Sequence, residues 1–218
     1  FSLVKFLSIE LPVYTIMLSR FLAGPIYLGP YFIAVKKSPV VSNWPYMLMR
    51  VFFGVTAMTC LFLAFKYGQL AKSMLIFELS VIWTLMYGWL RYGNMPHRYS
   101  LMAIPLAFAG MVAVLQPTGF FDFQIGDLFA FLGSILNAGV YVTIKKLRDD
   151  HDTSTVVLVS YILSALIMMV PNLIAAPTLN VNLLLGLCAM CTVGFFGQMG
   201  MVLGFKFATA GISSLLML

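Results

Sequence analysis

Two side chains of opposite charge stand inside long apolar stretches of this sequence. Arg20 lies eight residues into the stretch that begins at Pro12, and Glu78 lies seven residues into the stretch that begins at Ala71. A charge at membrane depth costs at least about 2.5 kcal/mol and must find a partner or water. With a rise of about 1.5 Å per residue, the two lie about 12 Å and 10 Å from the same membrane face. We expect them to pair across a central cavity, where Arg20 attracts an anionic group and Glu78 balances it or takes up a proton. The alternative is a static ion pair that fixes helix packing.

A second group of chemically useful residues recurs at spacings of three or four, and therefore on one helix face. Its members are Ala130, Gly133, Ser134, Asn137 and Tyr141. Asn137 lies near the expected bilayer midplane, and Asn137 and Tyr141 offer donors and acceptors to a polar solute. Hydrogen bonding between packed helices is the other interpretation of such a stripe. We also expect Gln198 to face the cavity.

Several other residues favour purely structural roles. Arg50, four residues into its apolar stretch, is interpreted as a side chain that reaches the headgroups. The pairs Gly24-Pro25 and Gly29-Pro30 predict a kink or hinge. Four glycines on one face are expected to serve close helix packing: Gly194, Gly197, Gly200 and Gly204. Four aromatic residues are expected to serve as interfacial anchors: Trp44, Tyr46, Trp83 and Trp89.

The composition indicates which elements hold these residues. The chain is 61% hydrophobic and 9% charged, whereas soluble domains are about 25% charged. A membrane helix needs roughly 20 apolar residues, so we predict an all-α, polytopic transmembrane helix bundle in an unspecified membrane. The predicted spans are Pro12 to Val35, Tyr46 to Phe65, Ala71 to Leu90, Tyr99 to Leu115, Asp127 to Ile144, Ser154 to Ala175 and Asn182 to Phe205, with a partial span from about Gly211. Residues Phe1 to Ile9 are interpreted as the tail of a preceding helix.

An internal repeat organises these spans. The stretch from Leu63 to Phe77 returns as the stretch from Leu203 to Met217, with Lys66 and Lys206 in register. Five spans separate the two copies, so the copies face opposite ways across the membrane, as in inverted repeats of secondary transporters. Lys and Arg concentrate in the connections after every second span, which the positive-inside rule places on the cytoplasmic side. We predict one repeat over residues 1–117 and a second over residues 118–218.

Several segments together resemble the drug/metabolite transporter superfamily, specifically its EamA-type members. These segments are Phe65 to Gly68 with its copy Phe205 to Ala208, Pro96 to Leu101 followed by Ala109 to Val112, and Gly126 to Ala130 leading through Tyr141 to Leu147. The resemblance implies ten helices in two inverted five-helix repeats, of which this chain holds helices two to eight, the end of helix one and the start of helix nine. It also implies transport of small polar metabolites by alternating access.

The expected function is therefore secondary transport of a small polar or anionic metabolite. The alternative is a non-transporting structural membrane subunit of a larger complex. No enzyme signature, cofactor motif or metal cluster is visible, and Cys188 and Cys191 are interpreted as small apolar side chains. The net charge of +6 lies mostly in the short connections, so no nucleic-acid partner is expected. The expected partners are the lipid bilayer and a small-molecule solute, with a homodimer or a larger membrane complex left open.

Overall fold

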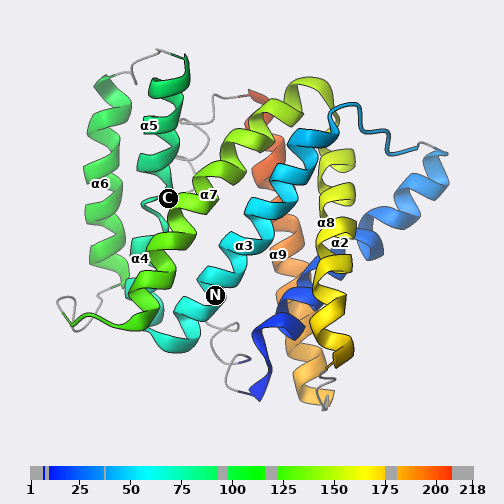
Figure 1. The fold of residues 1–218 in the computed structure, drawn as a ribbon, viewed down its shortest axis with the longest axis horizontal. Coiled ribbons are helices and arrows are strands. Elements are labelled where there is room, and N and C mark those ends of the chain that lie inside the picture. The colour runs from blue at the N-terminus through cyan, green and yellow to red at the C-terminus, as the bar shows by residue number, and fades with distance from the viewer. Residues whose placement is uncertain are drawn as a thin grey trace.

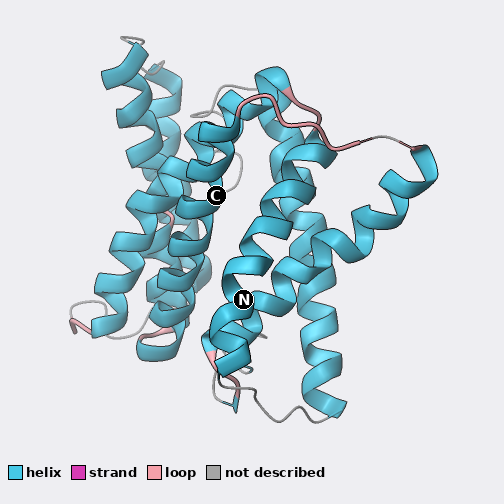
Figure 2. Ribbon diagram, turned by 45° about the vertical axis from the view of Figure 1, so that its right-hand side comes forward, coloured by secondary structure: helices cyan, strands magenta, loops and turns pink. Residues whose placement is uncertain are grey.

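The protein is a bundle of helices. The computed structural model describes residues 7, 10–36, 38–92, 98–115, 122–174 and 181–207. Within these ranges short connections join the helices and no strand occurs (Figure 2). The helices are α2 (Val13–Val35), α3 (Trp44–Tyr67), α4 (Leu70–Phe77), α5 (Ser80–Tyr92), α6 (Arg98–Leu115), α7 (Ile125–Asp150), α8 (Thr153–Ile174) and α9 (Val181–Phe207). The predicted all-α class is confirmed, whereas the partial span from Gly211 lies outside the described residues.

Six helical stretches are long and apolar enough to cross a membrane. They are Val13–Val35, Trp44–Tyr67, Leu70–Leu90, Ile125–Asp150, Thr153–Ile174 and Leu183–Gly204. A further helix, α6, occupies the place of the predicted span from Tyr99 to Leu115. Large apolar side chains stand on the outside of the bundle, for example Ile174, which is 83% exposed, and Ile33, which is 79% exposed. Such an outer surface suits lipid, and the chain is a multi-pass integral membrane protein.

Helices α3 and α7 run side by side through the centre of the bundle (Figure 1). In Figure 1, α4, α5 and α6 lie on one side of this pair, and α2, α8 and α9 lie on the other. The two most extensive helix contacts are α3 against α7 and α2 against α8. The starts of α3 and α8 lie at the upper edge of Figure 1, while the α3–α4 junction and the starts of α7 and α9 lie at the lower edge. The chain therefore passes back and forth between two ends.

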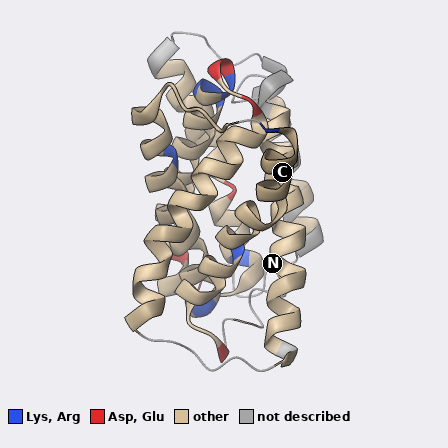
Figure 3. Ribbon diagram, turned by 90° about the vertical axis from the view of Figure 1, so that its right-hand side faces the viewer, with Lys and Arg blue, Asp and Glu red and all other residues tan. Residues whose placement is uncertain are grey.

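Charged residues gather near these two ends, and a few lie at mid-height (Figure 3). Lys145 and Asp149 form an ion pair of 3.8 Å near the end of α7, where both side chains are partly exposed. Residues at mid-height are more costly, because they lie among apolar side chains and away from water. These mid-height charges are the ones that the fold must position.

The α3–α4 junction is fixed to the start of α7 by backbone contact. A Cβ at Gly126 would lie 2.6 Å from the Cα of Gly68, so neither position has room for a side chain. Beside this contact, Lys72 and Asp127 form a buried ion pair of 2.7 Å. Lys72 also donates to the backbone carbonyl of Asp122 at 2.6 Å. The sequence of this corner therefore provides two glycines for close approach and two opposite charges to hold it.

Helix α2 passes through both of its internal prolines without interruption. Pro25 and Pro30 lie inside the helix, which ends where Lys36 takes a left-handed conformation with φ 50°. The first of the two predicted hinge pairs also serves packing, because a Cβ at Gly24 would lie 2.5 Å from the Cβ of Tyr161. Gly24 thus brings α2 close to α8 and sets one wall of the site described next.

Candidate functional site

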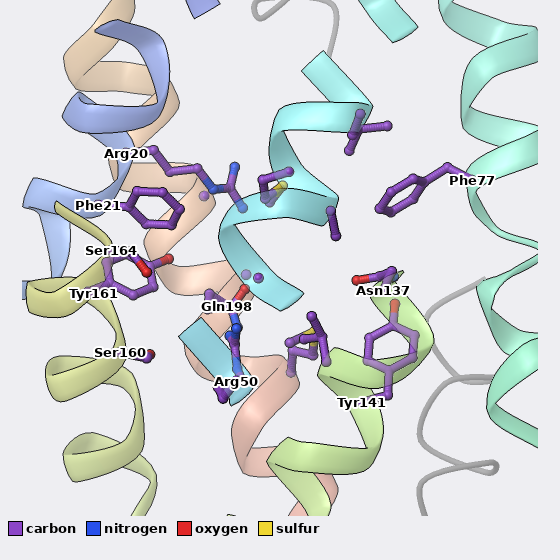
Figure 4. Close-up of a pocket in the computed structure, with 18 of the residues that line it drawn as sticks. Arg20, Phe21, Arg50, Phe77, Asn137, Tyr141, Ser160, Tyr161, Ser164 and Gln198 are labelled. Carbon is purple, nitrogen blue, oxygen red and sulfur yellow. The ribbon is translucent and has the colours of Figure 1, made fainter. Parts of the chain in front are cut away.

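A cavity of about 600 Å³ lies among α2, α3, α7, α8, α9 and the end of α4 (Figure 4). Its volume falls in the range of about 300–1,000 Å³ that small-molecule sites occupy. Apolar side chains form much of its wall, among them Phe21, Met58, Leu61, Phe77, Met190 and Met201. All five predicted site residues line it, namely Arg20, Glu78, Asn137, Tyr141 and Gln198. Residues far apart in the sequence therefore meet in one mid-bundle space.

Arg20 enters the cavity from α2. Its guanidinium group lies against α9, because a Cβ at Gly194 would lie 2.9 Å from its Nη1. Tyr161 of α8 lies beside it on the same side of the cavity (Figure 4). The predicted ion pair with Glu78 is not formed, since no Arg20 nitrogen lies within 4.0 Å of a Glu78 carboxylate oxygen. Matching depths brought both residues to one cavity, but they enter it from different walls.

Glu78 lies at a break in the predicted span from Ala71 to Leu90, which we expected to be one helix. Helix α4 ends at Phe77 and α5 begins at Ser80. At the break, the amide of Leu79 donates to the carbonyl of Ile76, and the amide of Val81 donates to the carbonyl of Glu78. These bonds span three residues rather than four and tighten the turn, as in a 3₁₀ segment. Interrupted membrane helices often lie at solute or ion sites of transporters.

Arg50 is the clearest correction to the sequence analysis. We predicted that it reaches the headgroups, but it is only 7% exposed and lines the cavity. Helix α3 begins at Trp44, two residues before the predicted start, so Arg50 lies deeper than expected. Gly54, one turn further along α3, leaves room for its guanidinium group, which a Cβ at that position would overlap. The side chain therefore extends along the helix into the bundle.

The small and polar stripe on α7 divides into two parts. Ser134 accepts a hydrogen bond from the indole nitrogen of Trp83 at 3.1 Å and packs α7 against α5. Trp83 is therefore a packing residue and not the interfacial anchor that we predicted. Asn137 and Tyr141 line the cavity instead, and the amide nitrogen of Asn137 donates to the hydroxyl of Ser80 at 3.2 Å. Asn137 thus combines both interpretations of the stripe.

Helix α9 contributes Gln198 and an open glycine face. Gln198 lines the cavity beside Arg50 (Figure 4), and its side-chain nitrogen is buried without a hydrogen-bond partner. The predicted close approach of another backbone along the glycines is not found within the described part of the chain. Among the described residues, nothing lies within 4 Å of a Cβ built at Gly197, Gly200 or Gly204. Gly194 alone meets a neighbour, and that neighbour is the side chain of Arg20.

Three residues of α8 that were not among the predicted site residues also line the cavity: Ser160, Tyr161 and Ser164. The ring of Tyr161 packs edge-on against Phe21, with centroids 5.7 Å apart. The sequence contained a signal for this lining, because Ser160 and Ser164 are four residues apart and share one face of an otherwise apolar helix. Their spacing resembles that of Asn137 and Tyr141 on α7.

The electrostatic character of the cavity comes from three charged residues and a set of unpaired polar atoms. Arg20, Arg50 and Glu78 are the charged residues of the lining. Arg50 Nε, Glu78 Oε2 and Gln198 Nε2 are each buried without a hydrogen-bond partner. Buried polar atoms are usually satisfied by protein or water, and unsatisfied ones are costly. This arrangement can accept a solute that supplies both donors and acceptors.

Comparison with known proteins places this geometry in context. No curated protein matches the chain. One solved crystal structure of a protein is similar over 98% of this chain and 80% of its own chain, with a TM-score of 0.74 and 15% sequence identity. At this identity the similarity concerns the fold alone. A family model matches residues 1–116, so the match ends one residue before the predicted end of the first repeat at residue 117. The division into repeats stays a prediction. The matching model is that of the EamA-like transporter family, it covers more than half of the sequence, and the chain belongs to that family.

Proposed function

We propose that this chain forms the solute pathway of a secondary transporter, which carries a small polar or anionic metabolite by alternating access. The observation that carries the proposal is the group of charged and polar side chains that line one mid-bundle cavity, namely Arg20, Arg50, Glu78, Asn137 and Gln198. Charged side chains at membrane depth cost free energy, and for that reason they are rare and usually functional. A site that receives a polar solute has a reason to keep them.

The proposed roles follow from position and chemistry. Arg20 and Arg50 attract an anionic or electron-rich group, since guanidinium groups remain charged and offer several donors. Asn137, Tyr141 and Gln198 orient the solute through hydrogen bonds, and Glu78 at the helix break balances the positive charge. The interrupted helix and the open face of α9 support a pathway that changes shape around the site.

Transport in proteoliposomes tests the proposal. Vesicles that contain the full-length protein should accumulate at least one member of a mixture of amino acids, organic acids, sugar phosphates and nucleobases, as measured by mass spectrometry. Arg20→Ala and Arg50→Ala should each abolish that uptake while the protein still inserts, because each removes a guanidinium group from the cavity.

Lys146→Ala is the matched control, since it also removes one positive charge but from an exposed position near the end of α7. Its uptake should equal that of the parent protein. Full transport by the Arg20 and Arg50 variants would contradict the assigned site. Stoichiometric copurification with partner subunits, together with no uptake at all, would favour the structural-subunit alternative.

A further inference from the structure

We propose that the cavity selects its solute by charge, that the selected solute is an organic monocarboxylate, and that Glu78 sets this preference. The inference rests on the transport function proposed above. It starts from the charge of the lining, which contains Arg20, Arg50 and Glu78 as its charged residues. Arginine keeps its proton in proteins, so an ionised Glu78 leaves the cavity with one net positive charge. One negative charge on the solute makes the loaded cavity neutral.

The geometry provides a place for a carboxylate. Arg50 Nε and Gln198 Nε2 are both donors, and both are buried without a partner. Figure 4 shows the two side chains next to each other in the cavity. A carboxylate has two oxygens that can accept from two neighbouring donors, and the bond from a guanidinium group is charge-assisted. A carboxylate in the cavity beside these two side chains would accept hydrogen bonds from the guanidinium group of Arg50 and the amide group of Gln198.

Glu78 acts from a different wall, and its charge is not consumed by an ion pair. Neither arginine of the cavity has a nitrogen within 4.0 Å of its carboxylate. The polar neighbour within its electrostatic reach is Tyr141 of α7, whose hydroxyl is hydrogen-bonded to Asn137 and Ser80. Because Coulomb interactions extend over several ångströms in a weakly polar interior, Glu78 lowers the positive potential of the whole cavity. It would therefore oppose a second negative charge on the solute.

The remaining wall favours an organic body over an inorganic ion. Phe21, Met58, Leu61 and Phe77 present apolar surface to the same space. A small inorganic anion would leave this surface uncovered, whereas a carboxylate with an attached hydrocarbon part would bury it. The class that fits both the charge and the wall is an organic acid with one carboxylate.

Three four-carbon probes test this inference: butyrate, succinate and butyramide, with one, two and no negative charges. Binding is measured by thermal stabilisation of the purified full-length protein at about pH 8, where both carboxyl groups of succinate are ionised. The parent protein should bind butyrate at least about tenfold more tightly than succinate, a difference of 1.4 kcal/mol. Glu78→Gln should reverse the order, because it raises the cavity charge by one. Glu78→Asp keeps the charge and should keep the preference for butyrate.

Arg50→Gln supplies an independent arm, since it removes one positive charge and should bind butyramide at least as well as butyrate. The inference is overturned if the parent protein binds succinate as tightly as butyrate, if neither acid stabilises it, or if a folded Glu78→Gln variant keeps the original order. The ratio of the butyrate and succinate affinities of the parent protein tests the inference even if a variant fails to fold. Uptake of solutes irrespective of charge would overturn charge selection alone, whereas the absence of any uptake would contradict the transport function.

Discussion

The buried ion pair between Lys72 and Asp127 should be a principal stabilising contact at its end of the bundle. Its Nζ to Oδ2 distance is 2.7 Å, and the two side chains are 7% and 6% exposed. Asp127 Oδ2 also accepts from the backbone amide of Gln124 at 2.9 Å, within the capping box of α7. Removing one partner of a buried pair costs about 3–5 kcal/mol, because the remaining charge stays buried. We therefore expect Lys72→Met and Asp127→Asn each to lower the free energy of unfolding by about this amount.

A double-mutant cycle measures the interaction itself. The combined Lys72→Met and Asp127→Asn variant should lose clearly less than the sum of the two single variants, since it leaves no unpaired charge. Equilibrium unfolding of the purified protein in detergent provides the free energies. The matched control is Lys145→Ala, which removes one partner of the partly exposed pair with Asp149. Such a pair contributes about 0.3–0.5 kcal/mol. Single-variant losses below about 1 kcal/mol, or strictly additive effects, would refute the reasoning.

Two smaller predictions concern helix packing. Gly24→Ala should destabilise the protein by about 1–3 kcal/mol, because the new Cβ would lie 2.5 Å from the Cβ of Tyr161. The control, Gly29→Ala, meets open space within the described structure and should be neutral or slightly stabilising in the same unfolding assay. Equal losses of stability for the two variants would contradict this packing. The hydrogen bond between Trp83 and Ser134 gives the second prediction. Trp83→Phe and Ser134→Ala should each lower the free energy of unfolding by about 1 kcal/mol, and the double variant should lose little more than either single variant. Fully additive losses would show that the hydrogen bond contributes nothing.

The helices were predictable because membrane spans leave strong signals. Apolar runs bounded by Pro, Gly and charged residues placed most helix ends within a few residues of those in the structure, for example Val35 at the end of α2. The break at Glu78 and Leu79 was not predictable in the same way, since neither proline nor glycine marks it. Hydropathy is a sum along the chain, and it does not register a local change in hydrogen bonding.

The site was predictable only in part. Depth along a helix correctly brought Arg20 and Glu78 to the same cavity, but depth alone carries no information about direction around the helix axis. Arg20 and Glu78 enter the cavity from different walls, and they form no ion pair. For Arg50, the outcome depended on Gly54 one turn away, which leaves space for a side chain to extend inward. Contacts of this kind arise only when helices from distant parts of the sequence pack together.

The contact between Gly68 and Gly126 divides the protein mechanically. Two backbones touch there without intervening side chains, so this contact has no rotamers through which it could yield gradually. Helix α9 presents the opposite situation, because the described surroundings of Gly197, Gly200 and Gly204 leave free space beside its backbone. Direct backbone contact therefore fixes the α3–α7 side, whereas little of the described structure borders the glycine face of α9. If the cavity changes shape, we expect α9 to be displaced more than α3 and α7.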